Sequence, residues 1–215
     1  GKKGIIVMNA PEGNIITTAE HTMALLLAMS RNIPQARSSL KNKKWAPKEF
    51  MGVELYEKTL GIIGLGRIGS IVSERARAFQ MKIIVYDPYI SQERAEKLGV
   101  ELVELKDLLG RSDFLTLHTP GLAGKPLLGK KEFEQMKPGI RIVNCARGSL
   151  IDDAALIEAV ESKIVAGASL DVYHKEPLDL DSPLLQVEEI ICTPHLGAST
   201  GEAQEKVATA ICDQI

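Results

Sequence analysis

Three glycines between an apolar run and a helical pattern constrain this chain more than any other feature. Residues 60–63 are the short apolar run expected of a buried parallel strand. Gly64, Gly66 and Gly69 follow at the G-x-G-x-x-G spacing, and a helical pattern begins at once. The first glycine allows a tight turn, the second lets backbone approach a pyrophosphate, and the third lets the helix pack on the strand. The spacing predicts the first turn of a Rossmann-type fold, with phosphates at the helix N-terminus.

A second apolar run ends at an acidic residue. Residues 82–86 read KIIVY, and Asp87 follows them at about 20 residues from the glycines. A carboxylate in this place bonds the adenosine ribose hydroxyls and repels a 2′-phosphate, so we expect NAD rather than NADP. A glycine pattern alone is equally typical of an ordinary loop. The ordered series of strand, glycines, helix, strand and acid predicts a dinucleotide site.

From residue 60 the chain alternates strands and helices. This alternation predicts an α/β fold: a Rossmann-type, doubly wound parallel sheet with helices on both faces. Asp152 is a plausible N-cap, and Gly139 follows Pro138 at an expected helix stop. Strands are expected at 60–63, 82–86, 114–117, 141–145, 165–170 and 190–193, and helices at roughly 67–80, 92–98, 105–110, 131–136, 152–162 and from 201 onward.

Both ends of the chain are expected to be borders with a second domain. A β-type run at residues 5–8 starts almost at the first residue, whereas such a strand normally has partners earlier in the sequence. We therefore expect residues 1–16 to be the remnant of a substrate-domain strand and crossover, with the chain cut there. The helix from 201 has no stop signal, so 201–215 are expected to begin a helix that returns to that domain.

Residues 17–57 are expected to be a helix and an arm. Thr17 and Glu20 fit a capping box that opens a helix running to about Arg31, with Pro34 marking its exit. This helix is apolar nearly all round and should be buried.

The polar arm at 36–57 resembles a solvated segment, but its apolar side chains need cover: Trp45, Phe50 and Met51. A subunit interface provides such cover. We therefore expect a homodimer or a higher homo-oligomer.

Composition excludes several classes of partner. A formal net charge of −2 provides no basic field for nucleic acid and no polybasic patch for a membrane surface. The apolar run at 23–29 is too short to span a bilayer. Cys145, Cys192 and Cys212 are odd in number and lack any C-x-x-C pattern, so we expect buried thiols in a reducing cytoplasm, without disulfides or a metal site.

Polar residues with catalytic chemistry follow several predicted strands. In open parallel sheets, ligands bind beyond the carboxyl ends of the strands. Arg147, Asp171 and His195 each follow a strand, and Glu176 lies just past Asp171. Taken singly, an arginine of this kind pairs with a surface carboxylate, a glutamate in a charged loop is solvated, and a lone histidine is structural. Their convergence on one edge of the sheet predicts a catalytic site there.

The motifs along the chain resemble those of one enzyme family. The matching strings are GIIGLGRIG, VYDP, LHTP, VNCARGSLID, GASLDVYHKEP and TPHLGAST, and the upstream segments NAPEGNIITTAEHTMALLLAMSR and KWAPKEFMG fit as well. On these residues the sequence resembles the D-isomer-specific 2-hydroxyacid dehydrogenases over nearly its whole length. The resemblance implies an NAD-binding domain whose substrate domain is absent from the chain.

The resemblance also implies roles for individual residues. His195 would be the general acid/base, and Glu176 would orient it and favour its charged form. Arg147 would hold the substrate carboxylate and carbonyl. Arg67 and Ile68 would meet the pyrophosphate, and Asp171 would lie near the nicotinamide amide. The full expected cofactor set is Gly64, Gly66, Arg67, Ile68, Gly69, Asp87, Thr119, Pro120, Cys145, Ala146, Arg147, Asp171, His195 and Gly197.

The implied substrate stays open. The resemblance favours members that oxidise 3-phosphoglycerate to 3-phosphohydroxypyruvate at the start of serine synthesis. Another D-2-hydroxyacid, of the glycerate, glyoxylate or lactate type, is the alternative, and a dinucleotide-sensing corepressor on the same fold is a further one. The segment AGKPLLGKKEF replaces the threonine-rich turn usual in the family, so the ends of the helix near residue 130 are not fixed by the resemblance.

Overall fold

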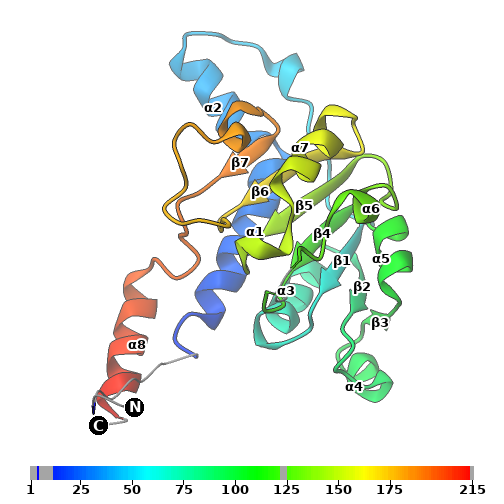
Figure 1. Ribbon diagram of the computed structural model, residues 1–215, viewed down its shortest axis with the longest axis vertical. Coiled ribbons are helices and arrows are strands. Elements are labelled where there is room, and N and C mark those ends of the chain that lie inside the picture. Colours follow the sequence, from blue (N-terminus) through cyan, green and yellow to red (C-terminus); the bar gives the residue numbers. More distant parts are fainter. Residues whose placement is uncertain (1–3, 5–11, 122–124, 214–215) are drawn as a thin grey trace.

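The computed structural model describes residues 4, 12–121 and 125–213. The strand expected at 5–8 lies outside the described residues. The core is one parallel sheet in the order β3-β2-β1-β4-β5-β6-β7 (Figure 1). Its strands are β1 (Thr59–Ile63), β2 (Lys82–Tyr86), β3 (Glu101–Leu102), β4 (Phe114–Leu117), β5 (Ile140–Asn144), β6 (Val165–Leu170) and β7 (Ile190–Cys192). The predicted doubly wound architecture is confirmed, and β3 is the one strand that the sequence pattern did not predict.

Helices cover both faces of the sheet and separate two apolar cores. Alternate residues of β1 point to opposite faces: Leu60 and Ile62 lie in one core, whereas Ile63 lies in the other. The first core packs against α1 (Ile15–Ser30), α3 (Arg67–Ala78) and α4 (Gln92–Lys97). The second packs against α5 (Leu105–Arg111), α6 (Lys130–Phe133) and α7 (Asp153–Glu161). None of the described helices is long and apolar enough to cross a membrane.

The start of α1 differs from the expected capping box. The helix begins at Ile15 with Asn14 as its N-cap residue, so Thr17 lies inside the first turn and caps nothing. Glu20 contacts Arg75 of α3 at 3.1 Å instead of reaching back along its own helix. The expected burial of this helix is confirmed, because Ala19 and Leu26 are fully buried between the sheet and α3.

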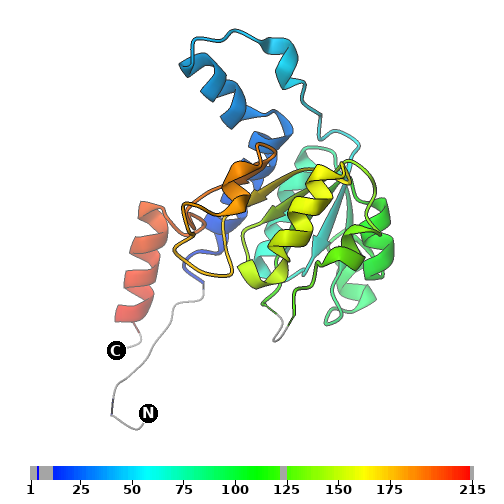
Figure 2. The same cartoon turned by 45° about the horizontal axis from the view of Figure 1, so that its top comes forward.

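The arm after α1 contains a helix that the sequence pattern did not predict. Pro34 lies in the first turn of α2 (Ile33–Lys41), a position where the missing N–H of proline costs nothing, so it starts a helix after the turn. The helix and η1 (Pro47–Phe50) extend away from the sheet in both views (Figures 1 and 2). Trp45 and Met51 are 82% and 80% exposed. Phe50 is half-buried, so Trp45 and Met51 are the two of the three expected apolar side chains that face solvent.

Three further helix ends can be compared with the sequence predictions. Asp152 is the N-cap of α7 and accepts a hydrogen bond from the Ala155 backbone at 2.9 Å, as predicted. Helix α6 ends at Phe133, so Gly139 lies in the turn before β5 and not at a helix stop. The helix expected from 201 is α8 (Gly201–Cys212), which stands apart from the sheet (Figure 2).

The prediction of buried thiols is right for one cysteine of three. Cys145 is buried, Cys192 is half-buried and Cys212 is exposed, and all three are free. Cys212 lies on α8, where Ala203 is the one fully buried residue of the helix.

Candidate active site at the carboxyl edge of the sheet

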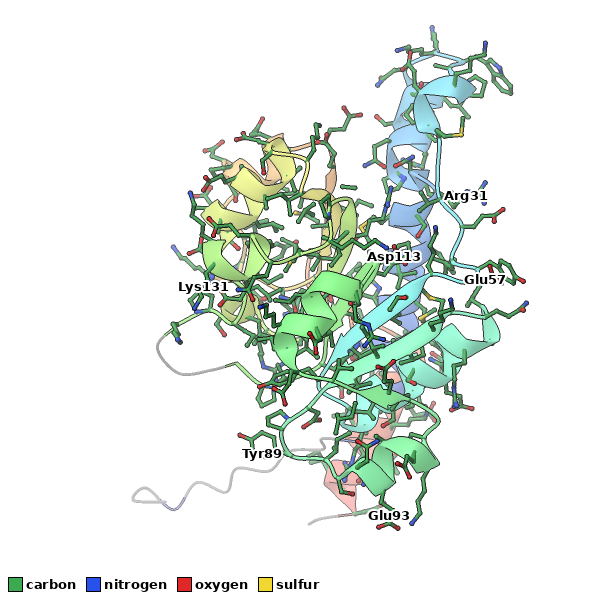
Figure 3. The ribbon with its side chains drawn as sticks, turned by 90° about the vertical axis from the view of Figure 1, so that its right-hand side faces the viewer. Arg31, Glu57, Tyr89, Glu93, Asp113 and Lys131 are labelled. Atoms are coloured by element: carbon green, nitrogen blue, oxygen red, sulfur yellow. The ribbon has the colours of Figure 1, made fainter. Side chains whose placement is uncertain are left out.

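The loops that leave the strands gather at one edge of the sheet and enclose a cavity. Figure 3 shows the two edges: Tyr89 follows β2 at the carboxyl edge, and Asp113 precedes β4 at the opposite edge. The cavity measures about 470 Å³, within the usual range for ligand sites. Eight of the expected site residues line it: Ile68, Thr119, Pro120, Cys145, Ala146, Arg147, His195 and Gly197.

The glycine turn has the geometry that its sequence demands. Gly64 adopts φ +92°, which other residues rarely do, and a Cβ there would lie 2.7 Å from the His118 carbonyl oxygen. At Gly69 a Cβ would overlap the Gly64 carbonyl oxygen, so the helix needs a glycine to pack on the turn. Gly66 has nothing within 4 Å of a Cβ position. The space at the N-terminus of α3 is thus open for phosphates, and the residues fit a dinucleotide.

Asp87 is tied to this turn by its backbone contacts. One carboxylate oxygen accepts a hydrogen bond from the Leu65 backbone at 2.8 Å, and the other accepts one from Tyr89 at 2.9 Å. Each oxygen keeps a lone pair for a further donor. Arg67, the first residue of α3, pairs with Glu12 at 2.8 Å on the surface.

Glu176 and His195 form a direct pair. His195 Nδ1 lies 2.6 Å from Glu176 Oε2, and the second carboxylate oxygen accepts a hydrogen bond from the Tyr173 backbone at 3.0 Å. Burial raises the pKa of Glu176, but the hydrogen bonds from His195 and Tyr173 outweigh it and hold that pKa below its ordinary range. The carboxylate is therefore charged near neutral pH and faces the imidazole.

A buried carboxylate holds the loop that carries His195. His195 has φ +55°, a left-handed conformation that costs a non-glycine residue about 1 kcal/mol or more. Asp171 accepts backbone hydrogen bonds from Leu196 and Gly197, both at 2.8 Å, and one from the Thr193 hydroxyl at 2.5 Å. Burial raises the pKa of Asp171, but these bonds and one from His21 more than reverse the effect and lower it. Asp171 lies behind the cavity wall, fully buried, rather than on it.

Asn144 organises the loop that carries Arg147. Its side chain donates to the Arg147 carbonyl at 2.9 Å and accepts from the Ala146 backbone at 3.0 Å. Arg147 itself is exposed on the cavity wall. A polar residue at the end of the apolar strand IRIVN was the signal that could have identified Asn144 from the sequence.

Two histidines that the sequence did not assign also lie at the site. His118 lines the cavity, and burial lowers its pKa to about 3, so its ring is neutral and accepts or donates one bond with Thr116 at 3.0 Å. His21 on α1 lies 3.2 Å from Asp171, with Nε2 as the contacting atom. Nothing in the helical pattern distinguishes His21, because its partner is 150 residues away in the sequence.

Three comparisons with known proteins identify the family. Residues 23–197 match the family model described as D-isomer specific 2-hydroxyacid dehydrogenase, NAD binding domain. A D-3-phosphoglycerate dehydrogenase from Archaeoglobus fulgidus is 51% identical over 215 residues, which are all of this chain and 41% of that protein. The chain thus spans about two fifths of that relative's length.

Solved structures agree. The pyruvate reductase of Chlamydomonas reinhardtii superposes with a TM-score of 0.91 at 30% identity, over 99% of this chain and 68% of that one. The D-lactate dehydrogenase of Aquifex aeolicus, complexed with NAD and lactic acid, gives 0.86 at 30% identity, over 99% and 69%. With the glycine turn, Asp87 and the strand-end cavity in place, the cofactor is NAD, and the chain belongs to the NAD binding domains of the D-isomer specific 2-hydroxyacid dehydrogenases.

Proposed function

We propose that this chain is the cofactor-binding and catalytic-residue domain of an enzyme that oxidises 3-phosphoglycerate to 3-phosphohydroxypyruvate with NAD, the opening step of serine synthesis. The observation that carries the chemistry is the 2.6 Å pair between Glu176 and His195 beside the strand-end cavity. The substrate is supported by the 51% identity to D-3-phosphoglycerate dehydrogenase, against 30% to the pyruvate and lactate enzymes.

The pair suits a general base. Glu176 accepts the Nδ1 proton of His195, which leaves Nε2 with its lone pair for the proton of the substrate hydroxyl. The carboxylate then offsets the positive charge that develops on the ring. When bound, NAD accepts the hydride from the carbon that carries the hydroxyl. Arg147 on the cavity wall is placed to hold the substrate carboxylate as a charged fork.

The remaining residues of the expected cofactor set take their roles from position. Arg67 and Ile68 begin α3 beside the open space at Gly66, where the pyrophosphate would lie. Thr119, Pro120, Cys145 and Ala146 would contact the middle of the nucleotide. Asp171 would position the loop that carries His195 near the nicotinamide, and Gly197 would lie at the end of that loop.

We assign residues 58–200 to the Rossmann core, 1–16 and 201–215 to the connections with a substrate domain, and 17–57 to a subunit interface. The exposed Trp45 and Met51 support the interface. The three free cysteines support a reducing cytoplasm. For hydride transfer the substrate must be held in position and water must be excluded from the site, and we expect a second domain to do both. We therefore expect the chain alone to bind NAD without efficient turnover.

The test is an NADH absorbance assay on the full-length protein with 3-phosphoglycerate, D-glycerate and D-lactate, and with glyoxylate in the reverse direction. We expect the highest kcat/KM for 3-phosphoglycerate and a loss of roughly 100-fold or more in kcat for His195→Asn. A higher kcat/KM for another hydroxyacid would move the assignment to that substrate. NAD binding without turnover of any of them would favour a dinucleotide sensor.

A further inference from the structure

A cluster of three metal-ligating side chains lies outside the catalytic pair. His21 comes from α1, Cys145 follows β5 and Asp171 follows β6. Their donor atoms, a ring nitrogen, a sulfur and a carboxylate oxygen, all lie within 4.8 Å of one another. Cys145 and Asp171 are buried, and the His21 side chain is 18% exposed. We propose that this cluster is a binding site for a soft divalent cation such as zinc, and that the cation and NAD compete for the cavity.

The donor set selects the class of ion. Nitrogen, sulfur and oxygen donors together are typical of zinc, which binds three protein ligands and keeps a fourth position open in sites that meet solvent or substrate. Magnesium and calcium prefer sites made of oxygen alone. Within the described residues, His21, Cys145 and Asp171 are the one group of this kind. The cluster should therefore bind zinc or cadmium and should not bind magnesium.

The distances fit tetrahedral coordination. His21 Nε2 and Asp171 Oδ1 are 3.2 Å apart. With bonds of about 2.0–2.1 Å, an ion between them subtends about 104°, close to the tetrahedral angle of about 109°. A zinc–sulfur bond of about 2.3 Å requires the Cys145 sulfur within about 3.5 Å of both atoms. Each of its two distances thus has to shorten by at most about 1.3 Å, which rotation of the Cys145 side chain can supply.

The surroundings hold the carboxylate in place, and the side of Oδ1 that faces His21 is the one an ion would take. Thr193 and Leu196 donate to Oδ1, and Gly197 donates to Oδ2, so three bonds besides the contact with His21 orient Asp171. The Thr193 hydroxyl also lies 3.4 Å from His21 Nε2. His21 makes the longest of the Oδ1 contacts, so an ion that replaces it displaces the weakest bond. The ring then binds through the Nε2 lone pair with its proton on Nδ1.

The thiol must lose its proton to become a ligand. Burial raises the pKa of Cys145 to about 12, so the sulfur is a thiol in the metal-free protein. Binding of the ion therefore releases a proton, as at other thiolate sites. In the metal-free protein His21 contacts Asp171 at 3.2 Å.

Competition with NAD follows from the position of Cys145. This residue lines the strand-end cavity together with Ala146 and Gly197, so the fourth position of the ion opens into the space of the cofactor. An ion with its bound water there excludes the end of the dinucleotide that approaches His195. The competition rests on the proposed cofactor position, whereas zinc binding itself requires neither substrate nor turnover.

The experiment is calorimetric titration of the metal-free protein with zinc chloride, repeated with magnesium chloride. We expect one zinc per chain with micromolar or tighter affinity, and no magnesium binding. Cys145→Ser and His21→Gln should each weaken zinc binding roughly 10- to 100-fold, whereas Cys192→Ser and Cys212→Ser should leave it unchanged. Cadmium should add an ultraviolet thiolate charge-transfer band that Cys145→Ser removes.

Thermal melts of each variant without metal establish that it is folded. Because two variants on different elements probe the site, loss of folding in one leaves the other to decide. Zinc affinity equal in the unmodified protein, Cys145→Ser and His21→Gln would overturn the site. Zinc binding that saturating NAD does not weaken would overturn the competition alone, and turnover assays bear on neither result.

Discussion

Replacing Asp171 by asparagine tests how strongly this carboxylate holds the loop that carries His195. In the protein Asp171 accepts hydrogen bonds from Thr193, Leu196 and Gly197 while fully buried. The variant Asp171→Asn keeps the shape of the side chain but replaces one oxygen by an NH₂ donor. In the better of its two orientations the amide oxygen faces Thr193 and Leu196, and the NH₂ group faces the N–H of Gly197.

The cost can be worked from these contacts. The Gly197 N–H loses its acceptor, which costs about 1–3 kcal/mol for a buried donor. The bonds from Thr193 and Leu196 lose the charge of their acceptor, at about 1 kcal/mol each. We expect a loss of about 3–5 kcal/mol in the free energy of unfolding at pH 7. For a chain of this size, about 2–4 °C per kcal/mol gives a fall in Tm of about 6–20 °C.

The assay is thermal unfolding followed by circular dichroism, with Asp179→Asn as the matched control. Asp179 is exposed and accepts one hydrogen bond, from the Asp181 backbone at 3.0 Å, so its loss should cost less than about 0.5 kcal/mol. A fall in Tm of less than about 2 °C for Asp171→Asn, or equal falls for the two variants, would refute the reasoning.

The pH dependence of the same variant follows from the sign of the pKa shift. The pKa of Asp171 is lower in the folded than in the unfolded chain, since hydrogen bonds outweigh its burial. Its stabilisation is therefore fully present above the unfolded pKa of about 3.9 and is lost as the pH falls through the folded pKa. The difference in Tm between the protein and Asp171→Asn should be constant from about pH 5 to 8 and should shrink below about pH 4.

Three further changes have clear expected outcomes. Asp87→Ala should weaken NAD binding and narrow the gap between NAD and NADP in calorimetric titrations; tighter NADP binding by the unmodified chain would contradict this. Tyr173→Phe removes a hydroxyl that donates to the Thr193 carbonyl at 2.8 Å, so urea unfolding should show a loss of about 1–3 kcal/mol, and an unchanged midpoint would count against it. Gly69→Ala should lower Tm much more than Gly66→Ala, because of these two glycines only Gly69 lacks room for a Cβ. Equal Tm values for the two variants would exclude that explanation.

The strands were predictable because each is a short apolar run between clear breaks. The ranges 82–86, 114–117 and 165–170 agree with β2, β4 and β6. Such runs are buried on both faces, so composition alone marks them. Strand β3 has two residues, Glu101 and Leu102. A run of this length is too short to show a hydrophobic periodicity. Its place is set by pairing with β2, which is a tertiary contact.

Helix ends in the first 60 residues were harder to predict, because the local sequence was compatible with more than one start or end for each helix. Thr17 and Glu20 satisfied the spacing of a capping box, yet Asn14 takes the N-cap position, because its carbonyl accepts the first helical hydrogen bond, from the Thr18 backbone at 2.9 Å. Pro34 was consistent with a helix exit and equally with a helix start, and in the structure it lies in the first turn of α2, a helix without a buried residue.

The sequence could predict which site residues follow the ends of strands, but it could not predict which residues hold them in place. Register explains the difference: β6 and β7 pair with Leu170 opposite Cys192, so Asp171 lies beside Thr193 and reaches the backbone of the His195 loop. The sequence places these residues more than twenty positions apart, and only the strand order brings them together. Because Asp171 is fully buried and bonded to that loop, loss of activity in its variants follows from displacement of His195 whether or not the carboxylate contacts NAD. A role at the nicotinamide therefore has to be measured as NAD affinity in a variant whose melting temperature is preserved.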